Sequence, residues 1–175
     1  MFAKTFRNTL IASSLLVGAS LLAGPAALAA TDNGEATGTV QAVNTIDFTP
    51  ATGTAITGGA AELAYPMGTL ALQDNATAGW TLEVSSLNGG KLLHTVTPAN
   101  VIAYTQLTTD DLGASTATPV DFVAAATNYE LHDSLFDAVV AEGVTGIAVT
   151  AEIAAGQWVP VGTYADTLTF TLTSK

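Results

Sequence analysis

Hydrophobic and polar residues alternate along much of this chain, and the alternation is strictest close to its C-terminal end. There, Leu168, Phe170 and Leu172 are separated by single threonines. A period of two places successive side chains on opposite faces of a β-strand, and β-branched threonine is well suited to the solvent-facing side. The pattern predicts a half-buried strand that ends the chain.

The same period recurs upstream, between short runs of turn-forming residues. Apolar residues expected to face inward in these strands are Leu70, Leu72, Trp80, Leu82, Val84, Ile147, Val149, Ala151 and Ile153. The dipeptide Gly89-Gly90 after Asn88 predicts a tight turn, and Gly162 predicts another before the last strand. Tyr164, just after that turn, is expected to bury its ring and bond its hydroxyl to the backbone. Residues 91–96 and 101–106 also have extended patterns, and residues 108–119 are expected to form a loop.

One stretch predicts a short helix. Residues 133–143 begin with Asp133, a good N-cap, carry apolar residues at helical spacing and end at Gly143. Elsewhere, strands of about five to seven residues separated by Gly, Asn and Pro favour two packed antiparallel sheets. The predicted fold is all-β: a single Greek-key-like β-sandwich of the immunoglobulin or pilin kind, with at most one short helix.

The N-terminal end predicts export. Lys4 and Arg7 precede a short apolar run, and small residues at 27 and 29 suit cleavage after Ala29 or Ala30. We therefore predict a signal peptide at 1–29, an N-terminal extension or first strand at 30–48, and a β-sandwich domain at 49–175. The expected location is secreted, on the extracellular cell surface, with transit through the periplasm if the cell is Gram-negative. No transmembrane segment is expected in the mature chain.

Charge narrows the range of partners. After residue 29 the chain keeps Lys91 and Lys175 against fifteen acidic residues, so two minus fifteen gives a net charge of −13. A phosphate backbone is bound by clustered Lys and Arg, which this chain lacks, so nucleic acid is excluded as a partner. We expect the partners to be copies of this chain, other surface-protein subunits, or cell-wall or glycan material.

The residues do not predict a catalytic centre. The chain has no cysteine, and its two histidines are His94 and His132, so zinc would require both with carboxylates. Ser134 and an aspartate lie beside His132 in sequence, but the sharp turn that exposes a nucleophile is missing. We expect no enzyme, no catalytic or metal-binding residue and no cofactor. Calcium stays a weak alternative, since loops carry oxygen donors without the spacing of a calcium loop. These donors are Asp74, Asn75, Asp110, Asp111 and Asp121. They are more simply interpreted as solvated turn residues.

Two motifs resemble known secreted families. The C-terminal stretch Gly162-Thr163-Tyr164-Ala165-Asp166-Thr167-Leu168-Thr169-Phe170 resembles spore-coat-U-like pilin subunits of archaic chaperone-usher systems. That resemblance implies an incomplete sandwich that is completed by the N-terminal strand of the next subunit. The phrase Gly79-Trp80-Thr81-Leu82 is similar to the WxL domain, which implies non-covalent attachment to the cell wall of Gram-positive bacteria.

The N-terminal region decides between two arrangements. Residues 31–39 are small and polar, and residues 40–48 alternate loosely. The whole of 31–48 could be a donor strand for a neighbouring subunit or the first strand of a self-contained sandwich. The side chains that would fill the core in either case are Val40, Ala42, Ile46 and Phe48. The expected function is a secreted, pilus- or fimbria-like or surface-coat subunit that assembles by strand addition. The alternative is a monomeric cell-wall- or glycan-binding module in which Trp158 could stack on a sugar or peptide.

Overall fold

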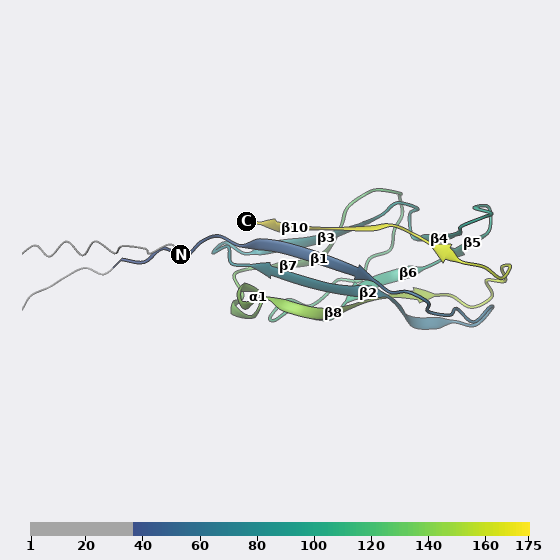
Figure 1. Ribbon diagram of the computed structural model, residues 1–175, viewed down its shortest axis with the longest axis horizontal. Coiled ribbons are helices and arrows are strands. Elements are labelled where there is room, and N and C mark those ends of the chain that lie inside the picture. The colour runs from purple at the N-terminus through teal and green to yellow at the C-terminus, as the bar shows by residue number, and fades with distance from the viewer. Residues whose placement is uncertain (1–36) are drawn as a thin grey trace, which may run out of the picture. The chain divides into compact units, whose positions relative to one another are not determined.

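The computed structural model describes residues 37–175, and the predicted signal peptide at 1–29 lies outside this range. The body formed by residues 39–175 is built from ten strands and one short helix (Figure 1). In chain order these are β1 (Asn44–Pro50), β2 (Glu62–Asp74), β3 (Trp80–Ser86), β4 (Lys91–His94), β5 (Val101–Ala103), β6 (Thr105–Thr109), β7 (Tyr129–Ser134), α1 (Ala138–Glu142), β8 (Val144–Ile153), β9 (Tyr164–Ala165) and β10 (Leu168–Ser174). The predicted all-β class is confirmed, whereas the Greek-key arrangement stays a prediction. No helix within the described range is long and apolar enough to cross a membrane.

The strands form three antiparallel sheets around one core. Their orders are β1-β2-β8-β6, β10-β3-β7 and β5-β4-β9. The alternation seen in the sequence produces this core directly, because inward positions of β3 and β8 are buried while their neighbours remain partly exposed. Trp80, Leu82 and Val84 have no exposed surface at all. The expected inward positions of β2, β3 and β8 are thereby confirmed.

One side of the body is closed by backbone pairing. The segment 115–120 lies between the edge strands β6 and β7 and bonds to both. Leu107 and Val120 exchange both backbone hydrogen bonds, and Thr118 N–H donates to the Leu131 carbonyl at 2.8 Å. Edge strands leave rows of unpaired N–H and C=O groups, so this segment satisfies groups that would otherwise be free.

The edge of β5 is covered by a side chain instead. The amide of Gln157 accepts from Ala103 N–H at 2.7 Å and donates to the Ala103 carbonyl at 2.8 Å. The amide reproduces the pair of bonds that a neighbouring strand would make. This contact also holds the 154–162 loop against the sheet.

A buried histidine links β6, β7 and the loop between them. His132 is 1% exposed, with Nε2 2.7 Å from Thr109 Oγ1 and Nδ1 3.0 Å from Ser115 Oγ. Thr109 Oγ1 donates to the Asp110 carbonyl, so a neutral ring with its proton on Nε2 satisfies every group. Burial lowers the pKa of His132, against a smaller opposing effect from the negative charge of Asp111.

Three of the expected element boundaries are wrong. The helix begins after Asp137, which accepts from Val139 N–H at 2.8 Å, and not after Asp133, which lies in β7. Asp137 also accepts from Ala114 N–H, and these backbone bonds, led by that from Ala114, hold the pKa of its carboxyl below the usual value. The single extended stretch expected at 101–106 is two strands, because Val101–Ala103 pairs with β4 and Thr105–Thr109 pairs with β8 of another sheet. The loop expected from residue 108 begins after β6 has ended at Thr109.

The buried histidine predicts loss of stability in mild acid. An unfolded His132 titrates near pH 6.5, whereas the folded protein binds that proton at lower pH. The unfolded state therefore binds more protons as the pH falls below about 6.5, and the free energy of unfolding decreases there, above the range in which carboxylates titrate. Urea denaturation from pH 8 to 5 measures this slope. His132→Asn should flatten the slope, and an unchanged slope in this variant would contradict the assignment.

Candidate functional site: the seam between β1 and β10

Strand β1 is an edge strand, and it pairs with β2 of the same chain over its whole length. Ile46 and Phe48 are half-buried against the core, as the alternation predicted. Val40 and Ala42 do not fill the core of their own sandwich, as a first strand would require, because both are exposed and precede the strand; their insertion into a neighbouring subunit stays a prediction. Strand β2 ends at Asp74, so residues before Val43 have no strand to pair with. In this structure residues 44–50 are therefore the first strand of their own sheet.

The ladder between β1 and β2 shows which backbone groups of β1 are free. Asn75 N–H donates to the Val43 carbonyl, and Ala51 N–H donates to the Met67 carbonyl. Val43 and Ala51 flank β1 at its two ends and are both odd-numbered, and the register between them has no shift. Since hydrogen-bonded positions alternate along an antiparallel pair, Asn44, Ile46 and Phe48 direct their backbone groups away from β2.

The same reasoning applies to β10, the edge strand of the second sheet. Leu87 N–H donates to the Thr167 carbonyl, and Lys175 N–H donates to the Gly79 carbonyl. The register with β3 is again unbroken, so odd-numbered residues bond to β3. Leu168, Phe170 and Leu172 therefore direct their backbone groups away from β3. Within the described part of the chain, no backbone hydrogen bond reaches these groups.

These two free edges lie beside one another, and we call the line between them the seam (Figure 1). Asn44 Nδ2 donates to Ser174 Oγ at 2.8 Å, and the rings of Phe48 and Phe170 are 4.7 Å apart between centroids. From the first contact to the second, β1 advances by four residues, from Asn44 to Phe48, whereas β10 goes back by four, from Ser174 to Phe170. The strands are thus antiparallel and matched residue for residue, yet they form no ladder within residues 37–175.

A polar cluster joins the two sheets at one end of the seam. Asp74 is 1% exposed, and its Oδ2 accepts from Asn44 Nδ2 at 2.9 Å and from Ser174 Oγ. Its Oδ1 accepts from Ala76 N–H at 2.9 Å. The interpretation of Asp74 as a solvated turn residue is therefore wrong. Its carboxylate connects β1, β2 and β10 through side chains, and hydrogen bonds to a charged group are stronger than average.

Beyond Phe48 the seam opens into a cavity of about 330 Å³. Its lining combines apolar residues, among them Met67, Leu92 and Leu168, with the polar residues Asp166 and Thr167. Gly68 on β2 creates room nearby, because a Cβ there would meet the Phe48 ring. The cavity is large enough for side chains delivered from outside the body.

The start of β10 is anchored by a second carboxylate. Asp166 Oδ2 accepts from Ser86 Oγ at 2.5 Å and from the Tyr104 hydroxyl at 2.6 Å, while Oδ1 accepts from Asn88 N–H at 3.1 Å and Thr167 N–H at 2.7 Å. Burial, with the hydrogen bond to Asp166, raises the pKa of Tyr104. This network fixes the direction in which β10 leaves the turn.

The remaining predicted residues lie outside the seam or support it. The Tyr164 hydroxyl donates to the Pro160 carbonyl at 2.7 Å, which is the backbone bond expected of it. Gly162 lies against His94, and a Cβ there would overlap the imidazole ring. Trp80 and Leu82 are in the core, whereas Leu172 is 8% exposed at the inner face of β10. The sequence did not predict the polar cluster of Asp74, Ser174 and Asn44, because no local pattern brings these three residues together.

The other chemical candidates are dispersed. Among residues 37–175, no three His, Asp or Glu side chains converge as metal ligands would. Three loop aspartates accept from backbone N–H groups instead: Asp110 from Ala148, Asp111 from Ala117 and Asp121 from Gln106. His132 contacts Ser115 rather than Ser134, in a buried position. Calcium binding gains no support from this arrangement.

Comparison of the chain with protein-family models, with curated proteins and with solved structures gives no match.

The polar cluster predicts a measurable stabilisation. Replacing Asp74 by Ala leaves Asn44 and Ser174 without their shared acceptor, and we expect the free energy of unfolding to fall by about 1–3 kcal/mol. Urea denaturation measures the change. Asp47→Ala, which removes the same charge from an exposed position of β1, should change stability by less than about 0.5 kcal/mol. Equal effects of the two substitutions would show that the cluster does not stabilise the fold.

Proposed function

We propose that this protein is a secreted, cell-surface structural subunit that assembles by strand addition at the seam, with β10 as the receiving edge. The observation that carries the proposal is the row of free backbone groups along β10, beside a β1 strand that runs antiparallel to it without bonding. An incoming strand would satisfy that row of N–H and C=O groups.

The two edges differ in how well they are protected. Strand β1 carries Asp47 and ends at Pro50, which has no N–H at a position directed away from β2. Strand β10 reads Leu-Thr-Phe-Thr-Leu-Thr-Ser, without a charge or a proline. Charged residues and proline are the usual means of blocking edge-to-edge pairing. Strand β10 is therefore the edge more open to addition.

The chain also offers a segment that could be the incoming strand. Residues 39–42 are exposed and lead directly into β1, and Val40 is 87% exposed. The cavity beside Phe48 and Leu168 could hold side chains of such a strand. The absence of cysteine and the net charge of −13 after residue 29 agree with a soluble subunit held by packing and backbone pairing.

Charge placed on the outer face of β10 should prevent assembly. Thr169 and Thr173 are exposed and lie opposite Ser85 and Thr81 of β3, so glutamates there leave the monomer intact. In an acidic partner they would oppose like charges and disfavour an added strand. We expect residues 30–175 to form oligomers or fibres with rising concentration, and Thr169→Glu/Thr173→Glu to remain monomeric. Light scattering after size exclusion and electron microscopy measure both.

The matched control adds the same charge to interior strands. Thr69→Glu/Thr145→Glu changes two exposed threonines on β2 and β8 and should assemble like the unmodified chain. Urea denaturation checks that both double variants are folded. A wild-type chain that stays monomeric at every concentration would contradict the proposal, as would equal loss of assembly in the control.

A further inference from the structure

Trp158 is the largest exposed apolar side chain within residues 37–175, with 80% of its surface accessible. Tryptophan is usually well buried, and exposed aromatic residues are enriched at binding surfaces. The indole lies against Gly59, since a Cβ on that glycine would overlap three ring atoms. Gly59 also has a φ of 76°, so both its conformation and its lack of a side chain suit this contact.

The loop that carries Trp158 is held on both sides. Gln157 bonds to Ala103 through both ends of its amide and to the Ala154 carbonyl at 3.2 Å. Gly156 N–H donates to the Gly59 carbonyl at 3.0 Å, which ties this loop to the one that supports the indole. The ring is therefore positioned before any ligand arrives, which lowers the entropic cost of binding.

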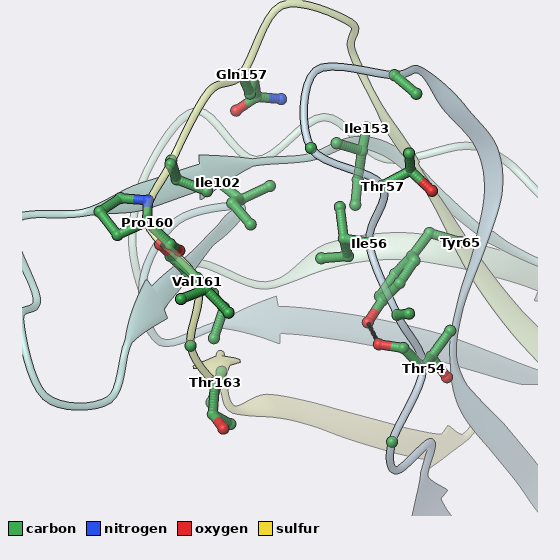
Figure 2. Close-up of a pocket in the computed structure, with 18 of the residues that line it drawn as sticks. Thr54, Ile56, Thr57, Tyr65, Ile102, Ile153, Gln157, Pro160, Val161 and Thr163 are labelled. Carbon is green, nitrogen blue, oxygen red and sulfur yellow. Dashed lines mark hydrogen bonds between the residues drawn. The ribbon is translucent and has the colours of Figure 1, made fainter.

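A cavity of about 760 Å³ lies between these same two loops, and Figure 2 shows Ile56, Ile102 and Ile153 within it. Gln157 and Val159, the neighbours of Trp158, belong to its lining. Trp158 itself does not, but its indole lies against Gly59, which does. The isoleucines make part of the lining apolar, and six hydroxyl groups belong to it, from Thr52, Thr54, Thr57, Thr163, Tyr65 and Tyr164. The two tyrosine hydroxyls donate to backbone carbonyls, which leaves the four threonine hydroxyls. No residue of the lining is charged, although the chain carries fifteen acidic residues.

We propose that Trp158 and this cavity form a binding site for a neutral carbohydrate chain, with the indole stacking on a sugar ring. The C–H groups of a pyranose face carry partial positive charge and are attracted to the negative face of an aromatic ring. The hydroxyls of the sugar can exchange hydrogen bonds with the threonine hydroxyls of the cavity. The uncharged lining suits a ligand without charge. An anionic polymer would be repelled by the acidic protein.

This site adjoins the seam cavity, with which it shares Ala51, Tyr65, Tyr164 and Ala165, but its lining includes no residue of β1 or β10. It uses the loops that follow β1 and precede β9, and it leaves the free edge of β10 uncovered. A subunit could bind carbohydrate whether or not it assembles. The experiment below is therefore carried out at concentrations at which size exclusion shows a monomer.

The two tryptophans make the test direct. Trp80 has no exposed surface, so acrylamide quenching of fluorescence reports on Trp158. We expect neutral hexasaccharides, with cellohexaose and maltohexaose as probes, to protect Trp158 from quenching with half-saturation near about 1 mM. A galacturonic acid hexamer, which is anionic, should give no protection. Calorimetry of Trp158→Ala should show binding that is weaker by up to about tenfold, while Trp158→Phe retains more of it.

Val123→Ala, which removes another exposed apolar side chain outside the cavity lining, is the matched control and should bind like the unmodified chain. Lack of protection by both neutral probes would overturn the proposal. So would unchanged affinity in Trp158→Ala. Protection that appears on raising the protein concentration without sugar would show instead that a second copy of the chain covers the indole.

Discussion

The arrangement of the two larger sheets depends on the absence of backbone hydrogen bonds between their neighbouring edge strands within the described residues. Two edge strands, β1 and β10, lie antiparallel and matched, and the structure joins them through side chains alone within the described residues. Asp74 connects both strands at one end of the seam, and two phenylalanine rings meet further along it. The opposite side differs, because segment 115–120 bonds to both β6 and β7 there. The body is thus closed by a ladder on one side and by side chains on the other.

Carboxylates perform much of the connecting work in this cysteine-free chain. Asp74 joins strands across the seam, Asp166 anchors the turn before β10, and Asp137 links the helix to the loop at Ala114. Each accepts from backbone N–H groups as well as, in two cases, from side-chain hydroxyls. A carboxylate accepts several hydrogen bonds at once and gains strength from its charge. The acidic composition therefore has a structural use besides solubility.

Local patterns in the sequence predicted the strands well where one face is buried, as in β3, β8 and β10. They failed where long-range contacts decide. Strand β2 begins at Glu62 and passes through Pro66 and Gly68, residues that locally indicate a break, because β8 pairs with it from Glu62 to Leu72 and β1 pairs with it from Gly68 to Asp74. The partners of Asp74 are thirty and one hundred residues away in sequence, so no local signal identifies them. That Trp158 stacks on a ligand stays a prediction, and the support of its indole on Gly59 depends on the fold.

Amide hydrogen exchange of the monomer tests the seam most directly, residue by residue. The account predicts slow exchange at Thr45, Asp47, Thr169 and Thr171, whose N–H groups bond to neighbouring strands, and faster exchange at Ile46, Phe48, Phe170 and Leu172. Alternation of fast and slow amides along both strands is the signature of two free edges. Uniformly slow exchange along β1 and β10 in the monomer would mean that the two strands bond to each other, and the account would be wrong.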